Sequence, residues 1–505
     1  MAGLNWQSAA ACAKQLMSGA EDGPGGALVG FDQNSVQITH AFGQADLATT
    51  TPFTADTISR YASVTKHIFC AFVLSHPEVI GLGDTLGQHL PQLQPEIARI
   101  TVEQALAMSG GVPDTREALT LIGHSVFTRT EPADLLDFHA AMTRPNYAPG
   151  TEVHYSNGGY RLVEEALRAK GLSFERFLEE RLRDGFGLSM RASEYWTDPV
   201  PGLAPGYIST AEGWQVGFQG MHLSAAGSMS GSAWDLARWG QILLAGEGPF
   251  DGMLGALSRP GRLTDGTLTG YGLGLRHHDF GGRAVVGHGG SQPGYKTYLL
   301  LDPEQRAGAA IVANRDDLNT ADILQQVLAA AFDLDLQAKP GTQLVPGLYV
   351  APTGADWLEI GTASARRLDD EVALYDVGGG VSDSLSPTSR MQLTMEGRSI
   401  RGHLGHAPAV FEPATEDAGP PVHLDGSWQA PAFEAHAEIR DGAFIFGAGP
   451  TRRAMPLRPL GGGRYLFTLR DGPTNRRICL AETGEGRFDL ALSRARTIGW
   501  TRLRN

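Results

Sequence analysis

The chain has 505 residues, too many for a single hydrophobic core, because cores stop growing at about 250 to 300 residues. Hydrophobic residues make up 42% of it and charged residues 19%, a composition that excludes a disordered or low-complexity chain. The length and the composition together predict two or three folded domains. The net charge of −14 repels nucleic-acid phosphates and anionic lipid headgroups, so we expect neither nucleic acid nor a membrane as partner.

The N-terminal residues and the cysteines indicate the cellular compartment that we expect for the protein. Residues 1–7 lack a basic region followed by an apolar stretch, so we expect no secretory signal. The apolar run 68–74 is far shorter than the roughly 18 residues that a membrane helix needs. Cys12, Cys70 and Cys479 are odd in number and far apart, which predicts neither a disulfide framework nor a metal-binding CxxC pair. A reducing cytoplasm fits these features best.

Residues 1 to about 334 mix extended and helical patterns. Strands are expected at 26–32, 35–42, 283–286, 297–301 and 308–313, and helices at 63–74, 102–108, 158–169, 174–183, 233–244 and 321–332. Two strand patterns open this region, helices fill its middle and three strand patterns close it. This order predicts an α+β domain in which one antiparallel sheet is built from both ends of the segment and flanked by helices.

The remaining chain has an internal repeat. Two stretches rich in Pro and Gly or acidic residues, 339–347 and 412–421, are typical of linkers. The offset that aligns Gly347 with Gly426 also aligns the dipeptide Glu-Ile at 359–360 with the one at 438–439. Short strand patterns recur between turn residues, at 372–375, 392–395, 443–446, 465–469, 488–492 and 500–503. Strands at such spacing close most economically into small antiparallel barrels, so we predict two of them.

The first candidate catalytic motif is Tyr-Ala-Ser-Val-Thr-Lys-His at 61–67, followed by an apolar run. On a helix that begins near Ser63, the amine of Lys66 lies one turn away and reaches the Ser63 hydroxyl. A serine hydroxyl needs such a neighbour to accept its proton, and burial favours the neutral, basic form of a lysine. The spacing Ser-x-x-Lys also arises by chance, so this motif alone leaves coincidence open.

The second candidate motif is the loop 147–158, in which a Pro-Gly turn and an Asn-Gly step precede a predicted helix. Tyr155 and Asn157 are two residues apart and can face the same cleft. The phenol would then act as acid or base and the amide would hold the substrate. The alternative is structural: Tyr155 is a turn aromatic, and Asn157 is there because asparagine tolerates a left-handed backbone.

The third candidate motif, residues 285–291, is an apolar strand that ends in His288, Gly289, Gly290 and Ser291. Glycines on a strand allow close approach to its backbone, which an edge strand that receives a substrate amide requires. His288 would orient the tyrosine or the substrate, and the backbone N–H groups of Ser63 and Ser291 would form an oxyanion hole. The alternative for His288 is a histidine that simply packs at the end of a strand.

Together the three motifs resemble those of the penicillin-recognising serine hydrolases, which include class C β-lactamases, D,D-peptidases and related esterases. Supporting segments match at 100–106, 109–114, 228–238, 288–294 and 302–304, and the resemblance covers roughly residues 1–335. It implies that Ser63 is acylated and that Lys66 and Tyr155 transfer its proton. It also implies that Asn157 binds a substrate amide and that His288, Gly289 and Gly290 form the third motif.

This chain departs from the β-lactamases at the third motif, where they carry Lys-Thr-Gly. Without that lysine no cation holds the carboxylate of the drug, so efficient penicillin hydrolysis is not expected. The His-x-Gly variant, the chain length and the two predicted barrels resemble the bacterial D-stereospecific aminopeptidases. That resemblance implies a catalytic domain at 1–335, a first barrel at 336–417 and a second barrel at 418–505 that contributes a loop to the active site.

The expected activity is release of N-terminal D-residues, D-Ala above all, from peptides, amides and esters through an acyl-enzyme. No metal or organic cofactor is implied. The expected partner is a small peptide or amide with a free N-terminal D-residue, and a homodimer is a further expectation. A free ammonium group calls for a carboxylate, for which Asp471 in the loop 469–474 is the candidate. The alternative is that this Asp-Gly-Pro segment is only a hairpin tip.

Two other functions remain open. A D-amino-acid amidase or an esterase of the same fold would share all three motifs and differ only in its pocket. A protein of another class, without catalysis, would use an inert penicillin-binding-like domain and two barrels to bind a ligand. The complete set of Ser63, Lys66 and Tyr155 argues against this last function, because a ligand sensor needs no activated nucleophile.

Overall fold

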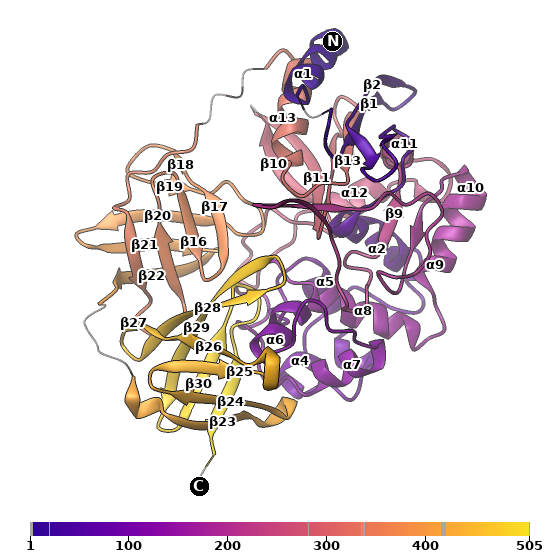
Figure 1. Ribbon diagram of the computed structural model, residues 1–505. Helices are drawn as coiled ribbons and strands as arrows, with labels where there is room; N and C mark the ends of the chain where they lie inside the picture. The colour runs from indigo at the N-terminus through magenta and orange to yellow at the C-terminus, as the bar shows by residue number, and fades with distance from the viewer. Residues whose placement is uncertain are drawn as a thin grey trace. The chain divides into compact units, whose positions relative to one another are not determined.

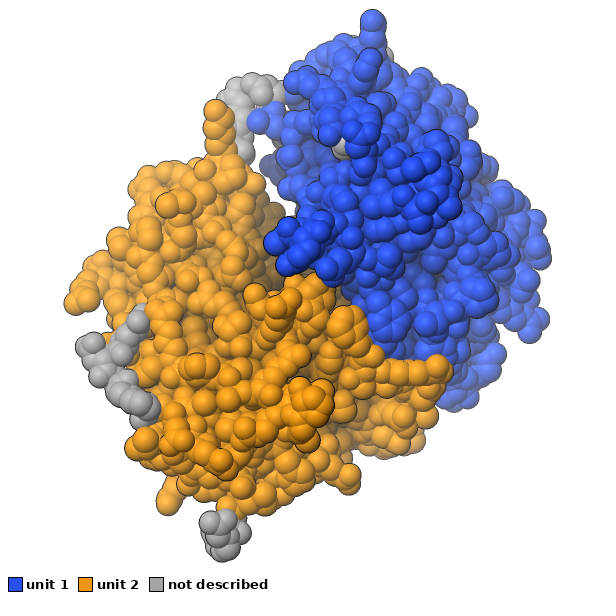
Figure 2. All heavy atoms as spheres, in the orientation of Figure 1, with its two compact units in different colours: residues 1–82, 163–261, 268–337 blue, residues 83–162, 262–267, 338–505 orange. Residues whose placement is uncertain are grey.

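The computed structural model describes residues 4–19, 21–280, 282–334, 336, 339–415 and 421–503 (Figure 1). The chain divides into two compact units (Figure 2). Unit 1 contains residues 1–82, 163–261 and 268–337, and unit 2 contains residues 83–162, 262–267 and 338–505. The predicted catalytic region therefore contributes segments to both units.

A six-stranded antiparallel sheet lies at the centre of unit 1, with the strand order β10-β11-β12-β13-β1-β2. Its strands are β1 (Gly26–Asp32), β2 (Val36–Phe42), β10 (Arg276–Phe280), β11 (Arg283–Gln292), β12 (Tyr295–Asp302) and β13 (Ala307–Ala313). Gly26 of β1 pairs with Ala313 of β13, so the two ends of the segment meet in one sheet. The predicted α+β arrangement is confirmed.

Helices cover both faces of this sheet. The α-helices longer than three residues that lie wholly in unit 1 are α1 (Trp6–Leu16), α2 (Thr65–Leu74), α9 (Phe174–Phe177), α11 (Ala233–Ala245), α12 (Met253–Ser258) and α13 (Thr320–Ala331). On one face α1 and α13 share an apolar cluster with Leu300 of β12. On the other face α11 brings Gly240 against Phe31 of β1. Because both faces are covered, β1 is a continuous apolar run and not an alternating one.

Unit 2 begins with a helical segment, residues 83–162. It contains α3 (Leu86–His89), α4 (Pro95–Ala98), α5 (Val102–Leu106), α6 (Thr115–Leu121), α7 (Pro132–Ala140) and the start of α8 (Gly158–Arg168). Asp114 caps α6, because its carboxylate accepts the backbone N–H groups of Arg116 and Glu117. This cap fixes the start of α6 and places a carboxylate there.

Two nine-stranded antiparallel sheets, each a nearly closed barrel, complete unit 2 (Figure 1). The first contains β14 (Gly347–Val350), β15 (Trp357–Ile360), β16 (Ser364–Arg367), β17 (Asp370–Ala373), β18 (Tyr375–Asp376), β19 (Ser382–Asp383), β20 (Met391–Glu396), β21 (Ser399–Leu404) and β22 (Ala407–Pro413). The second contains β23 (Gly426–Ala430), β24 (Ala435–Arg440), β25 (Ala443–Phe446), β26 (Arg453–Pro456), β27 (Arg458–Gly461), β28 (Arg464–Asp471), β29 (Thr474–Gly484), β30 (Arg487–Ala491) and β31 (Ile498–Arg502). Both predicted barrels are confirmed.

The two barrels repeat one topology at the offset that the sequence indicates. Gly347 pairs with Ile360 in the first barrel, and Gly426 pairs with Ile439 in the second. The first strand of each barrel also pairs with the last one, β14 with β22 and β23 with β31. A shared strand register explains why the same dipeptides recur in both halves of the tail.

The predicted domain limits fall beside residues whose structure is not described. Residues 335, 337 and 338 lie outside the described residues, as does the stretch 416–420 inside the second predicted linker. The limits at 335/336 and 417/418 therefore stay predictions. In the described part of the chain, no helix combines the length and the apolar character that crossing a membrane requires.

Candidate active site

Ser63 lies in a short helical turn, η1 (Ala62–Val64), that leads directly into α2. The preceding residue, Ala62, has a φ of 48°, a left-handed conformation that costs energy for any residue with a side chain. The hydroxyl of Thr65 donates to the carbonyl of Ala62 at 2.6 Å and holds this turn. The strained turn therefore presents a half-buried Ser63 in a defined position.

The amine of Lys66 is fully buried and lies within hydrogen-bond distance of the Ser63 hydroxyl. Its Nζ is 3.1 Å from Ser63 Oγ and donates to the carbonyl of Ala226 at 2.6 Å. One helical turn places the two side chains together, as the spacing predicts. In its neutral form this amine can take the proton of the hydroxyl, which is the requirement for a serine nucleophile.

His288 lies on β11 and is completely buried. Its Nδ1 is 2.6 Å from the carbonyl of Gly289, which can only accept, so the proton is on Nδ1. Its Nε2 then accepts from the hydroxyl of Tyr271 at 3.0 Å. Burial, with Arg276 and Lys66 as nearby positive charges, holds the pKa of His288 well below 6.5. The third motif therefore presents an uncharged imidazole.

The glycines of the third motif let β11 lie close to neighbouring parts of unit 1. A Cβ atom on Gly290 would lie 2.0 Å from the carbonyl oxygen of Tyr61 and 3.0 Å from Cβ of Ala62. Only a glycine lets β11 approach the turn that carries Ser63 so closely. Ser291 follows on the same strand, and its hydroxyl accepts from Lys296 at 2.9 Å. Unit 1 thus brings Ser63, Lys66 and the third motif together.

Tyr155 and Asn157 lie in unit 2, on the loop that precedes α8. The backbone and side-chain N–H groups of Asn157 both donate to Oδ2 of Asp114, at 2.9 and 2.7 Å. Tyr155 is buried, and the guanidinium carbon of Arg494 lies 4.8 Å from the centre of its ring. Asp114 therefore orients the amide, and a residue of the second barrel packs on the phenol.

Both barrels hold the loop that carries Tyr155. The turn after β21 in the first barrel is bonded to it, since the carbonyl of Gly405 accepts the Val153 N–H at 2.9 Å. Glu152 on this loop pairs with Arg367 of the first barrel at 2.9 Å and with Arg496 of the second at 3.0 Å. The tail of the chain thus fixes the position of the second motif.

Asp471 lies at the tip of the β28–β29 hairpin and is buried. Its carboxylate pairs with Arg116 and accepts from the hydroxyl of Ser125 at 3.0 Å and from the N–H of Val126 at 2.7 Å. These contacts fasten the hairpin to the segment after α6. They favour a structural role, and the role of Asp471 as an ammonium ligand stays a prediction.

The groups beside Tyr155 form a charged cluster. Glu117 accepts the backbone N–H of Arg494 at 2.6 Å, and burial raises the pKa of Glu117 to about 7. Burial opposes ionisation of Asp114 too, but Arg494 and the N–H groups of Asn157 and Glu117 hold the pKa of Asp114 below its usual value. Asp114 is therefore charged at neutral pH, whereas Glu117 is close to half protonated.

Four groups that matter to these contacts were not among the sequence candidates: Ala226, Tyr271, Asp114 and Arg494. Ala226 acts through its backbone and leaves no signal in the sequence. Asp114 is the last residue of the segment 109–114. That segment matches the family that the sequence resembles, and this match was the sequence feature that pointed to Asp114. Tyr271 and Arg494 are distant in sequence from the side chains they contact, so no local spacing points to them.

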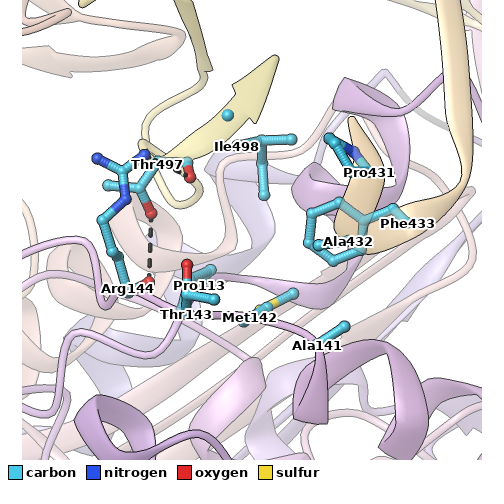
Figure 3. A pocket seen from close by; sticks show the side chains of 11 residues that line it. Pro113, Ala141, Met142, Thr143, Arg144, Pro431, Ala432, Phe433, Thr497 and Ile498 are labelled. Atoms are coloured by element: carbon cyan, nitrogen blue, oxygen red, sulfur yellow. Dashed lines mark hydrogen bonds between the residues drawn. The ribbon is translucent and has the colours of Figure 1, made fainter. Parts of the chain in front are cut away.

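Unit 2 also contains a pocket of about 100 Å³ between the end of α7 and the second barrel (Figure 3). Met142 and Thr143 line it on one side, and Phe433 and Ile498 line it on the barrel side. Arg144 at its edge donates to the carbonyl of Thr497 at 3.3 Å. Its lining includes none of the sequence-predicted site residues, so it is separate from the candidate active site.

The chain is similar both to a known family and to known protein sequences. A protein-family model described as "Beta-lactamase" matches residues 10–333. A D-aminopeptidase of Brucella canis is 26% identical over 367 residues, which cover 71% of this chain and 67% of that protein. The family match spans all three motifs, and the sequence similarity extends over most of the chain.

Two solved structures share the fold. The octameric penicillin-binding protein homologue from Pyrococcus abyssi has a TM-score of 0.55 and 16% identity, and the match covers 98% of this chain and 99% of that one. The D-amino acid amidase from Ochrobactrum anthropi SV3 has a TM-score of 0.53 and 22% identity, over 65% of this chain and 98% of that one. The first likeness includes the tail of the chain.

Proposed function

The chain belongs to the beta-lactamase family and is a serine hydrolase, and we propose that it is a D-stereospecific aminopeptidase. It would release N-terminal D-residues, D-Ala above all, from peptides, amides and esters. The observation that carries the proposal is the 3.1 Å contact between the Lys66 amine and the half-buried Ser63 hydroxyl. The name of the D-aminopeptidase relative supports the substrate class.

In the proposed reaction, Ser63 Oγ attacks the carbonyl carbon of the N-terminal residue, and the hydroxyl proton passes to Lys66 and Tyr155. The same pair delivers a proton to the leaving amine as the C–N bond breaks, which leaves the residue esterified to Ser63. A water molecule then gives a proton to the pair and attacks the ester. That proton restores the Ser63 hydroxyl as the D-amino acid leaves.

The remaining site residues have proposed roles in binding. The backbone N–H groups of Ser63 and Ser291 donate to the oxyanion of the tetrahedral intermediate. Asn157 holds the substrate amide, and the backbone of β11 at Gly289 and Gly290 receives the substrate along the strand. The steps above balance with the chain's own groups and one water molecule, so we propose no cofactor.

The neutral His288 supports an aminopeptidase over a penicillin-hydrolysing enzyme. Because the pKa of His288 is held well below 6.5 by burial, this position offers no cation to a substrate carboxylate. A penicillin carboxylate would therefore lose its main partner at the third motif. A peptide or amide that is recognised at its amino end does not need that partner.

A D-amino-acid amidase is the second candidate, because a protein of that activity shares the fold. The two activities use the same reaction and differ in the leaving group, which is ammonia for an amide and a peptide amine for a dipeptide. Rates with D-Ala amide, D-Ala dipeptides and short acyl esters separate them. A preference for amides over dipeptides supports the amidase, and a preference for esters without an amino group rejects both.

We also propose the cellular compartment and the oligomeric state of the protein. Cys12, Cys70 and Cys479 are all free thiols, which fits a reducing compartment, so we propose the cytoplasm. Cell fractionation tests this, and recovery of the protein outside the cytoplasm contradicts it. A homodimer is the proposed assembly, and the mass measured by light scattering decides it.

The central test uses D-Ala p-nitroanilide and its L enantiomer. We expect Ser63→Ala to remove turnover and Lys66→Arg to lower it by about 10² to 10⁴, because a guanidinium stays protonated and cannot act as a base. Lys170→Arg, at an exposed lysine, is the matched control. Retained activity in Ser63→Ala refutes the assignment, and equal rates for both enantiomers refute the stereospecificity.

A further inference from the structure

Tyr155 exchanges a proton near neutral pH in the proposed reaction, although its phenol is buried. A phenol ordinarily loses its proton only near pH 10, and Tyr155 is buried, with 5% of its surface exposed. Burial in a low-dielectric environment disfavours a phenolate unless a positive charge lies close to it. A tyrosine that takes part in proton transfer therefore needs a cation nearby.

Arg494 is such a cation within unit 2. It lies on the loop between β30 and β31 of the second barrel, and its guanidinium carbon is 4.8 Å from the centre of the Tyr155 ring. An opposite charge at about 4 to 6 Å stabilises an ionised group. The contact is also a cation–π stack, which restricts the orientation of the ring.

The loop that carries Arg494 is held firmly by backbone contacts. The carbonyl of Arg494 accepts the N–H of Asp114 at 2.8 Å, and its N–H donates to Glu117 at 2.6 Å. The hydroxyl of Ser493 donates to the same carboxylate at 3.2 Å. These bonds join the barrel loop to the start of α6 and fix the backbone from which the Arg494 side chain extends.

The guanidinium of Arg494 makes a long ion pair with the carboxylate of Glu117. Its Nε is buried and has no hydrogen-bond partner among the described residues, and it is 4.0 Å from Glu117. Burial raises the pKa of Glu117 to about 7, so this neighbour is only partly charged at neutral pH. The charged and titratable groups around Arg494 are Asp114, Glu117, Asp370, His154 and Tyr155.

Arg496, two residues further along the chain, differs from Arg494 because its guanidinium is hydrogen-bonded to a carboxylate. Its guanidinium donates to Glu152 at 3.0 and 3.2 Å and to the carbonyl of Ser493 at 3.0 Å. It also stacks on a tyrosine, Tyr147, at 5.6 Å. The same loop thus holds two stacked arginines, Arg496 hydrogen-bonded to a carboxylate and Arg494 in a longer ion pair of 4.0 Å.

We propose that Arg494 is a positioning residue for Tyr155: its guanidinium holds the phenol ring and supplies the positive charge that favours the deprotonated form. This inference rests on the proposed function, in which Tyr155 exchanges protons with Ser63 and the leaving group. It assigns the second barrel a direct part in the chemistry through one side chain. Arg494 acts through Tyr155 and does not itself touch the reacting atoms.

The test is the pH dependence of kcat/KM for D-Ala p-nitroanilide in the full chain. In Arg494→Met we expect the acidic limb of the profile to move to higher pH by about one unit or more, because the deprotonated pair loses its stabilising charge. Arg494→Lys keeps the charge and should return the limb close to its original position. Arg496→Met, in the same loop, keeps the charge over Tyr155 and should move the limb less.

The pH profiles of these variants show whether Arg494 acts on Tyr155 or has another role. If Arg494→Met lowers the rate equally at all pH values, or moves the limb no more than Arg496→Met does, the proposal is overturned. Circular dichroism checks that the variants fold, and if Arg494→Met does not fold, the neutral but polar Arg494→Gln takes its place. The proposed function fails separately, through activity that survives in Ser63→Ala.

Discussion

The hydroxyl of Tyr271 donates to Nε2 of His288 at 3.0 Å, and both side chains are fully buried. The bond joins the segment before β10 to the strand that carries the third motif. Since Nδ1–H of His288 donates to the carbonyl of Gly289, Nε2 is the acceptor, and Tyr271 is the donor that keeps it hydrogen-bonded and the imidazole oriented.

Tyr271→Phe should therefore lower the free energy of unfolding by about 1 to 3 kcal/mol, the cost of a buried acceptor that loses its donor. It should also lower kcat/KM, because His288 loses its orientation. Tyr298→Phe is the matched control, since it removes a bond of the same length to His278 on the other face of the sheet. Urea unfolding and hydrolysis rates measure both effects; equal activity losses in the two variants would contradict a role for Tyr271 at the site.

Gly290→Ala should destabilise the chain and reduce turnover. The new Cβ would lie 2.0 Å from the carbonyl oxygen of Tyr61, so β11 must move away from the turn that carries Ser63. We expect a loss of about 1 to 3 kcal/mol of unfolding free energy. Gly255→Ala, on α12 with open space around it, should instead gain about 0.5 to 1 kcal/mol. Thermal unfolding of both variants checks the prediction, and a Gly290→Ala chain as stable and active as the parent counts against it.

The buried His67 should make the fold less stable in acid. Its Nε2 accepts from Trp239 at 2.8 Å, and burial lowers the pKa of His67 from 6.5 to about 3. Below pH 6.5 the unfolded chain takes up a proton at this site and the folded chain does not, so stability falls by roughly 1.4 kcal/mol per pH unit until the folded group titrates.

In His67→Gln this contribution disappears. The loss of unfolding free energy between pH 7 and pH 5 should be smaller than in the parent chain by about 2 kcal/mol. Urea unfolding at the two pH values measures it, with His436→Gln at an exposed histidine as the control. The same loss in His67→Gln and the parent would mean that His67 is not the titrating group.

Asp471→Asn separates the two roles considered for that residue. Because its buried carboxylate pairs with Arg116 and accepts from Ser125 and Val126, we expect a loss of about 3 to 5 kcal/mol of stability. The ratio of KM values for D-Ala p-nitroanilide and an acyl ester without an amino group should stay the same. A tenfold rise in this ratio would instead identify Asp471 as the ammonium ligand.

Local spacing was enough to predict that the side chains of Ser63 and Lys66 lie side by side. Ser63 and Lys66 are three residues apart, and helix geometry alone brings such side chains together. The glycines of β11 also indicated a close approach to that strand, and the folded chain has the turn of Ser63 beside Gly290. The two barrels follow from turn residues and from a repeat that is visible at one offset.

The family resemblance, the α+β fold with two barrels, and the pairing of Ser63 with Lys66 could all be read from the order of residues, because they depend on spacing along the chain. Three contacts became visible in the folded molecule: Tyr271 donates to His288, Asp114 orients Asn157, and Arg494 covers Tyr155. The first two pairs are 17 and 43 residues apart, and the third joins the second barrel to a loop of the helical segment. Such pairs are set by how strands and loops pack, and packing depends on the whole core and not on any local pattern.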